Sequence, residues 1–183
     1  TIVNKEGRLI GHNTDFSGFA YMVRESGVEV FGKKALVLGT GGASNAVLAV
    51  LKKLGADPVI SVSRTGKNGA VTYEACMAEH SDASVIVNTT PVGMFPNMDA
   101  SPLDLTRFKA CEAVLAVSYN PGETKLTAQA KSLGMKGVTG LTMLVAQAKY
   151  ACELFLETTL DDAVIPVITK EIADQMYGAE EQK

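Results

Sequence analysis

Three features of the sequence predict an α/β fold built on a doubly wound parallel sheet. From residue 35 onward, short apolar runs alternate with stretches of helical periodicity, which is the pattern of βαβ units. The first of these runs ends in glycines that lead directly into a helical stretch. Hydrophobic residues make up 46% and charged residues 20% of the 183 residues, the balance of a globular protein rather than a disordered one. We therefore expect a single domain with one core.

The residues before the alternating region predict a hairpin followed by a helix. Two apolar segments, residues 1–3 and 9–10, flank Asn4–Arg8, which is typical of a hairpin turn. A stretch of helical periodicity then extends from about Phe16 to Glu25.

The alternating region itself begins with a continuous apolar run at Ala35–Leu38, as expected of a strand that is buried on both faces. Apolar residues at helical spacing from Ala43 to Leu54 predict the next helix, which Gly55 ends. Further strands are expected, with helices between them, at Val59–Val62, Val85–Val87 and Val114–Val117, and a short one at Lys136–Val138.

The end of the chain predicts two more helices. A last helix is expected from Asp161 to Tyr177, and the polar tail 178–183 is expected to fray. The helix before it carries an apolar stripe at i, i+3, i+4, i+7 spacing, formed by Leu141, Leu144, Val145, Ala148, Cys152 and Phe155.

Charge and hydropathy restrict the class of partner. The net charge is −3 and no long Lys/Arg run is present, which argues against nucleic acid or an anionic membrane as the main partner and favours a small molecule. No apolar stretch reaches the ~20 residues of a membrane helix, and the first residues lack the pattern of a secretory signal. We expect a cytoplasmic protein. Because the chain begins with Thr1 rather than methionine, we expect it to be part of a longer polypeptide.

The three cysteines predict neither a disulfide framework nor a metal site. Cys76, Cys111 and Cys152 are far apart, without CxxC spacing or neighbouring His pairs. We expect all three to be buried, reduced thiols.

A glycine-rich loop stands where a dinucleotide-binding loop must stand, after a buried strand and at the head of a helix. Small residues let the backbone turn tightly and approach a pyrophosphate, which then rests on the amides at the helix start. The alternative is a glycine-rich turn that only connects strand to helix. The residues concerned are Gly39, Thr40, Gly41, Gly42 and Ala43.

The end of the second strand indicates which dinucleotide is bound. NAD-binding domains place an acidic residue there for the ribose 2′-hydroxyl. This chain instead has Ser63-Arg64-Thr65-Gly66-Lys67, which offers hydroxyls and two cations to a 2′-phosphate. The sequence therefore favours NADP over NAD, although Arg64 and Lys67 as solvated loop charges are the alternative.

These features and several others together resemble the shikimate dehydrogenase family. The resemblance covers about residues 1–157, with the family's order and spacing. It rests on Gly11-His12-Asn13-Thr14-Asp15 followed by Gly18-Phe19, on the glycine-rich loop, on Ser63-Arg64-Thr65, on Asn88–Met94, on Tyr119-Asn120-Pro121 and on Gly140–Ala148.

The resemblance implies specific roles. Asp15 resembles the family's active-site aspartate, which partners a lysine in handling the proton of the hydroxyl that is oxidised. Asp15, Tyr119 and Gln147 resemble substrate contacts, and Thr89, Thr90, Val117, Gly140 and Met143 resemble cofactor contacts. Several of these assignments have an alternative: Asn13–Asp15 as a helix N-cap cluster, Gln147 as an ordinary exposed residue, and Met143 as a core residue.

The chain departs from the family in two respects. Ala116 occupies the position three residues before Tyr119 where the family usually has Asp. The family's amino-terminal domain, which supplies the catalytic lysine and most substrate contacts, is absent. We expect a hinge-side hairpin at residues 1–15, a Rossmann-like NADP-binding domain at 16–160, and a terminal helix and tail at 161–183.

The resemblance implies NADP-dependent oxidation of shikimate to 3-dehydroshikimate, the reverse of a reduction in aromatic amino-acid biosynthesis. The chain would be the cofactor-binding half of that enzyme, inactive without the missing domain. Quinate as substrate, a non-catalytic NADP-binding module, and another NADP dehydrogenase such as a folate-linked one are the alternatives.

Overall fold

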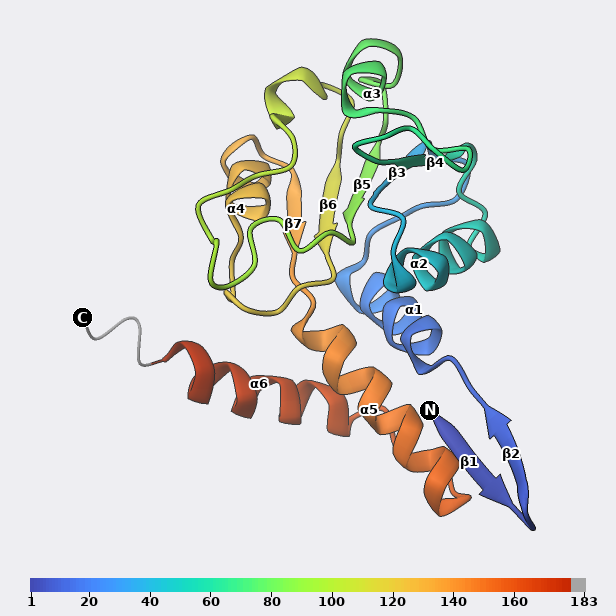
Figure 1. Ribbon diagram of the computed structural model, residues 1–183. Coiled ribbons are helices and arrows are strands. Elements are labelled where there is room, and N and C mark those ends of the chain that lie inside the picture. The colour runs from blue at the N-terminus through green and yellow to red at the C-terminus, as the bar shows by residue number, and fades with distance from the viewer. Residues whose placement is uncertain (179–183) are drawn as a thin grey trace.

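The computed structural model describes residues 1–178, and its central element is a five-stranded parallel sheet (Figure 1). All the predicted strands of the sheet are confirmed, with the one expected at Val114–Val117 displaced by one residue. In spatial order the strands are β4 (Val59–Val62), β3 (Ala35–Leu38), β5 (Val85–Asn88), β6 (Ala113–Ala116) and β7 (Lys136–Val138).

The chain reverses its direction of travel across the sheet after β4. From β3 it moves outward to β4, and it then crosses back to place β5 on the other side of β3. Leu38 and Asn88 are partners in the register of β3 and β5, so these two strands end at the same level. The sheet therefore has a topological switch point between the carboxyl ends of β3 and β5, the place where open α/β sheets bind ligands.

Helices cover both faces of the sheet, which confirms the doubly wound arrangement. One core lies between the sheet and helices α1 (Thr14–Ser26) and α2 (Gly42–Lys53). The other lies against α3 (Tyr73–Glu79), α4 (Lys125–Ser132) and a 3-10 helix, η1 (Leu105–Arg107). Because successive residues of β3, β5 and β6 enter opposite cores, these strands read as unbroken apolar runs in the sequence.

The predicted hairpin is present, but its turn is shorter than expected. Strands β1 (Ile2–Lys5) and β2 (Arg8–Gly11) leave only Glu6 and Gly7 in the turn, with φ of 53° and 84°. Positive φ at both central residues is the geometry that matches the twist of a two-stranded ribbon. The hairpin projects away from the parallel sheet (Figure 1).

The helix α5 (Leu141–Leu156) crosses α1 at very short range. A Cβ atom on Gly18 would lie 2.8 Å from the carbonyl oxygen of Met143 and 2.9 Å from the Cβ of Gln147. Gly18 therefore lets the backbones of α1 and α5 approach, and this contact brings the start of α1 next to Gln147.

The apolar stripe on α5 does not face the main core. Leu144, Ala148 and Cys152 instead line an apolar cavity of about 260 Å³ together with residues of α6 (Val164–Tyr177). Cys152 is exposed, so the prediction that it is buried was wrong. The reason is that α5 turns its Met143 and Ala146 side toward the protein interior, and the stripe receives only partial cover from α6.

The other cysteines and the chain end agree with expectation where they are described. Cys76 and Cys111 are buried free thiols, and burial raises the pKa of each to about 11. The last helix begins at Val164 rather than Asp161. Most of the predicted frayed tail, residues 179–183, lies outside the described residues. Within residues 1–178, no helix is both long and apolar enough to span a membrane.

A buried lysine ties three helical segments together. Lys149 on α5 is 7% exposed, and its Nζ atom lies 2.6 Å from Glu153 Oε1 and 2.9 Å from Asp162 Oδ1. Asp162, just before α6, also accepts a hydrogen bond of 2.8 Å from Arg24 on α1. The hydrogen bond from Lys149, followed by that from Arg24, lowers the pKa of Asp162, and the Lys149 bond likewise lowers the pKa of Glu153.

This network makes a prediction about pH and stability. A carboxylate whose pKa is lowered by folding stabilises the native state above its unfolded pKa of about 4, and the contribution is lost as pH falls through the lowered native value. Asp162→Asn should therefore lower the urea unfolding midpoint at pH 7, and the gap from the unmutated chain should narrow toward pH 3. Asp174→Asn, in the exposed pair with Lys170, is the control and should change little at either pH. If the difference in unfolding midpoint between Asp162→Asn and the unmutated chain stays constant with pH, the role assigned to this carboxylate is contradicted.

Candidate functional site

A cavity of about 530 Å³ opens at the switch point of the sheet. We call it the switch-point cavity. Three loops that follow β3, β4 and β5 form its walls, so residues far apart in the sequence meet there. Its lining residues are Gly39, Thr40, Gly41, Ser63, Arg64, Tyr73, Thr89, Thr90, Pro91, Val92, Ser101 and Pro102.

The first residue of the glycine-rich loop must be glycine for two reasons. Gly39 has φ of 105°, a conformation that costs other residues strain. A Cβ atom there would also lie 2.8 Å from the Oγ1 of Thr89 and 3.0 Å from the Cγ2 of Thr90. Thr89 is itself fixed, because its hydroxyl donates a 2.7 Å hydrogen bond to the carbonyl of Leu38. The absence of a side chain on Gly39 thus keeps β3 and the loop after β5 in contact.

The rest of the loop leaves the start of α2 open to an anion. Gly41 is the N-cap residue, and no side chain accepts a hydrogen bond from the first amides of α2. Cβ atoms on Gly41 or Gly42 would meet nothing within 4 Å, so the backbone is unobstructed on that side. Unpaired amides together with the positive end of the helix dipole favour a negatively charged group.

Asn88 organises the loop after β5, a role that its place in the sequence motif did not indicate by itself. Its buried side chain accepts hydrogen bonds from the amide and hydroxyl of Thr90, at 3.0 and 2.7 Å, and donates one to the carbonyl of Val92. The available signal was a polar residue at the end of an otherwise apolar strand.

The loop after β4 is closed at its base by strand-like pairing. The amide of Ser63 donates to the carbonyl of Val71, and the amide of Val71 donates to Ser61, both at 2.9 Å. Within the loop, the amide of Gly66 donates to the Ser63 hydroxyl at 3.1 Å. Arg64 is exposed and lines the switch-point cavity, whereas Thr65 and Lys67 are exposed and line no cavity described here.

A second cavity, of about 270 Å³, lies between the start of α1, the end of β6 and the start of α5. We call it the α1–α5 cavity. It brings together the three residues predicted to contact substrate and four of those predicted to contact cofactor. Its lining residues are Asp15, Ala43, Val117, Tyr119, Gly140, Met143, Leu144 and Gln147.

A second close backbone approach shapes this cavity. A Cβ atom on Gly140 would lie 2.1 Å from the carbonyl oxygen of Val117, and the Gly140 amide donates a 2.9 Å hydrogen bond to the carbonyl of Ser118. The start of α5 is therefore held against the end of β6. Met143 belongs to the core, as its alternative assignment expected, and it also lines the cavity.

Asp15 occupies an exposed position in the first turn of α1. Asn13 caps α1 by accepting a 3.2 Å hydrogen bond from the amide of Phe16, so the capping role does not fall to Asp15. Asp15 is exposed and has no hydrogen-bond or ion-pair partner among residues 1–178. Gln147 is half-buried beside it and accepts a 3.4 Å hydrogen bond from the hydroxyl of Thr14.

The carboxyl end of the last helix reaches the rim of this cavity, a contact that no sequence pattern indicated. The Tyr177 hydroxyl donates to the backbone carbonyl of Tyr119. Its ring also covers Gly122, where a Cβ atom would lie 3.0 Å from the ring. Tyr119, which is 38% exposed, thus has its backbone fixed by α6.

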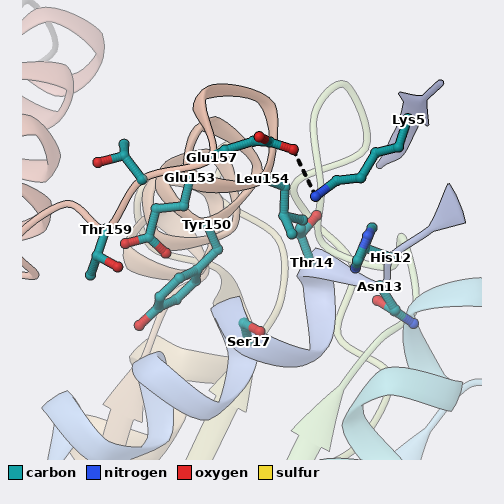
Figure 2. A pocket seen from close by; sticks show the side chains of 11 residues that line it. Lys5, His12, Asn13, Thr14, Ser17, Tyr150, Glu153, Leu154, Glu157 and Thr159 are labelled. Atoms are coloured by element: carbon teal, nitrogen blue, oxygen red, sulfur yellow. Dashed lines mark ion pairs between the residues drawn. The ribbon is translucent and has the colours of Figure 1, made fainter.

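A third and more polar cavity, of about 510 Å³, lies between β1, the start of α1 and the last turns of α5 (Figure 2). Lys5 and Glu157 form an ion pair of 2.7 Å across it, and Tyr150 and Glu153 approach from α5. His12, Asn13 and Thr14 line both this cavity and an open groove that extends to Asp15 and Gln147. A continuous polar surface therefore leads from Asp15 toward the hairpin.

The structure thus unites most predicted site residues in two cavities. Gly42, Thr65 and Lys67 line neither of them; Gly42 and Thr65 are each adjacent in sequence to a residue that does, whereas Lys67 is three positions from Arg64. Within the described residues no group of three or more His, Cys, Asp or Glu side chains is placed to hold a metal ion.

The doubly wound sheet, the glycine-rich loop and the switch-point cavity define a Rossmann-type domain. No family model matches the sequence. It is 32% identical over 181 residues to the shikimate dehydrogenase (NADP(+)) of Clostridium perfringens, covering 94% of this chain and 67% of that protein. The corresponding enzyme of Caldanaerobacter subterraneus is 35% identical over 170 residues, with 85% and 61% covered. The chain belongs to the shikimate dehydrogenase family and spans about two thirds of the length of these relatives.

Solved structures agree with this assignment. A chorismate mutase/shikimate 5-dehydrogenase fusion protein from Clostridium acetobutylicum matches with a TM-score of 0.89 at 30% identity, over 96% of this chain and 66% of that one. Shikimate 5-dehydrogenase from Thermus thermophilus, in complex with NADP(H) and shikimate, matches with a TM-score of 0.79 at 31% identity, over 93% and 66%.

The geometry of the glycine-rich loop predicts that its glycines differ in tolerance. Gly39→Ala should destabilise the fold by about 1–3 kcal/mol, because the substitution combines a positive φ with a collision against Thr89 and Thr90. Gly41→Ala is the matched control: its φ is −86° and its Cβ would enter open space, so the fold should be unaffected. Urea unfolding of both variants measures this difference, and equal stabilities would refute the close contact described for Gly39.

Proposed function

We propose that this chain is the NADP-binding portion of a shikimate dehydrogenase, which oxidises shikimate to 3-dehydroshikimate and catalyses the reverse reduction. The observation that carries the proposal is the position of the glycine-rich loop between the two cavities: Gly41 lines the switch-point cavity and Ala43, two residues later, lines the α1–α5 cavity. A dinucleotide laid across this segment has one half in each cavity, with its pyrophosphate over the start of α2.

The switch-point cavity holds the adenosine half of the cofactor in this proposal. The amides of Gly41 and Gly42 receive the pyrophosphate, and Thr40, Thr89 and Thr90 contact the cofactor from the neighbouring loops. The 2′-phosphate is bound by the loop after β4, with Arg64 as the principal contact because it lines the cavity, and with Ser63, Thr65 and Lys67 around it.

The α1–α5 cavity holds the nicotinamide end and the reacting carbon of the substrate. Val117, Gly140 and Met143 form the cofactor side, and Tyr119 and Gln147 supply a phenol and an amide for substrate hydroxyls. When bound between these residues, NADP would supply the hydride-accepting chemistry for the alcohol carbon. Asp15 holds the proton of the alcohol oxygen, and its freedom from internal partners is what this task requires.

In this proposal the residues of the chain form only part of the catalytic site. The relatives are about half as long again as this chain, which covers 61–67% of their length. We propose that their amino-terminal domain supplies the lysine that partners Asp15. In this division, residues 1–15 belong to the junction, 16–160 to the NADP-binding domain and 161–183 to a terminal helix and tail. The polar surface from Asp15 to the hairpin faces that junction.

Arg64→Ala provides the test of the cofactor. Calorimetric titration should show that the unmutated chain binds NADP more tightly than NAD. Removing the guanidinium should cost roughly 1.5–3 kcal/mol of NADP binding and leave NAD nearly unchanged, since only NADP carries the 2′-phosphate. Lys67→Ala, which lies outside the cavity lining, should have a smaller effect. Equal affinity of the unmutated chain for the two nucleotides would reject NADP as the cofactor.

Complementation with an amino-terminal domain tests whether the chain holds only part of the catalytic site. The chain alone should bind NADP without normal turnover of shikimate, because positioning by a second domain can supply ~7–11 kcal/mol of the barrier and acid–base help a further factor of about 10²–10⁴. Adding a matching amino-terminal domain should produce NADPH from shikimate, and Asp15→Asn should then reduce turnover by orders of magnitude with NADP affinity retained.

Three outcomes of these assays would count against the proposal. Full activity of the chain alone would reject the half-site, and full activity of Asp15→Asn would reject the role of that residue. NADP binding without turnover of shikimate or quinate, even with the second domain present, would favour a non-catalytic module.

A further inference from the structure

Tyr73 is a residue of the switch-point cavity to which the family resemblance gave no role. It is the first residue of α3 and the single aromatic residue among those that line this cavity within the described chain. Its half-buried ring also packs against the core on that face of the sheet. The ring is therefore a fixed wall rather than a mobile surface group.

The fold places Tyr73 beside Arg64 although eight residues lie between them in the sequence. Val71 pairs with Ser61 and Ser63, which closes the base of the loop. Thr72 then caps α3 by accepting a 3.2 Å hydrogen bond from the amide of Ala75, which fixes the direction in which the helix departs. Arg64 comes directly after Ser63, and Tyr73 comes two residues after Val71. Both residues therefore extend from the closed base of the loop, and both line the same cavity.

The environment of Tyr73 fits a flat, uncharged group. Burial raises the pKa of its phenol, with nearby Arg64 acting in the opposite direction, so the ring stays neutral at physiological pH. The Tyr73 hydroxyl has no hydrogen-bond partner among residues 1–178. The cavity is completed from the loop after β5 by Pro91, Val92 and Pro102, which present apolar surface. The result is an apolar compartment beside an arginine.

We propose that Tyr73 forms a wall of the adenine subsite and packs against the adenine ring. The inference rests on the proposed function. In NADP the 2′-phosphate and the adenine are attached to the same ribose, so a phosphate on Arg64 places the adenine in the adjoining compartment. Aromatic side chains bind nucleobases by stacking, an interaction that does not depend on the phosphate.

Binding measurements on the chain separate this role from that of Arg64. Because adenine is common to NADP, NAD and 2′,5′-ADP, Tyr73→Leu should weaken all three by a similar factor, about tenfold, and leave the NADP/NAD ratio unchanged. Tyr73→Phe keeps the ring and should retain most of the affinity. Phe31→Leu is the control for a general effect of losing an aromatic ring. This variant should bind all three nucleotides normally, because Phe31 is exposed and lies at the opposite ends of the strands.

A second measurement does not depend on the folding of the leucine variant. The rings of the five tyrosines can be labelled with carbon-13, and the Tyr73 signal is identified by its loss in Tyr73→Phe. Addition of 2′,5′-ADP should shift this signal through the ring current of the adenine. Inorganic pyrophosphate, which has no ring, should leave it in place.

The outcomes distinguish this inference from the function on which it rests. If the unmutated chain binds neither NADP nor 2′,5′-ADP, the proposed function fails and this inference with it. If the unmutated chain binds NADP and Tyr73→Leu binds equally well, only the assignment of Tyr73 fails. A loss confined to NADP, or a Tyr73 signal that does not respond to 2′,5′-ADP, would likewise overturn the adenine contact and leave the function standing.

Discussion

Close packing of neighbouring elements against glycines, which carry no side chain, is the constraint on which both cavities depend. It occurs at Gly39 against the loop after β5, at Gly140 against the end of β6, and at Gly18 against α5. A methyl group at any of these positions would lie within 3 Å of a neighbouring atom. Each contact restricts the distance between two elements that line the cavities, so the width of the cavities depends on glycine at these positions.

Some of the described charged side chains are paired within the fold, and others line the cavities without an ion-pair partner. Lys149, Glu153, Asp162 and Arg24 satisfy one another and join α1, α5 and the start of α6. Asp15 and Arg64 have no ion-pair partners among the described residues. A charged side chain at an open cavity can change partners at small cost, whereas a buried one left without its partner is strongly destabilising. This division allows Asp15 to be presented on a helix whose other end is clamped by Arg24.

Much of the fold could be predicted from the sequence because the relevant signals are local. Unbroken apolar runs arise from strands buried on both faces, and glycines after the first run indicate the loop at the switch point. A residue that lines a cavity could be identified where its loop has a distinctive composition, as at Arg64. Tyr73 and Tyr177 were missed because their contacts depend on which distant segments surround them. Asn88 was missed although its partners Thr90 and Val92 are local, because its hydrogen bonds depend on the conformation of the loop. The burial of Cys152 was wrongly predicted because helical periodicity identifies an apolar stripe but not the element that covers it.

The exchange of the family's usual Asp for Ala116 can be understood from its neighbours. Ala116 is fully buried and is the register partner of Asn88 on β5. A carboxylate at this place would be buried beside Asn88, whose side chain already bonds to Thr90 and Val92 within its own loop. Alanine places no buried charge there. In this chain the hydrogen bonds of Asn88 order the loop after β5. Val117 and Tyr119, which follow β6, line the α1–α5 cavity, and the uncharged Ala116 precedes them at the end of the strand.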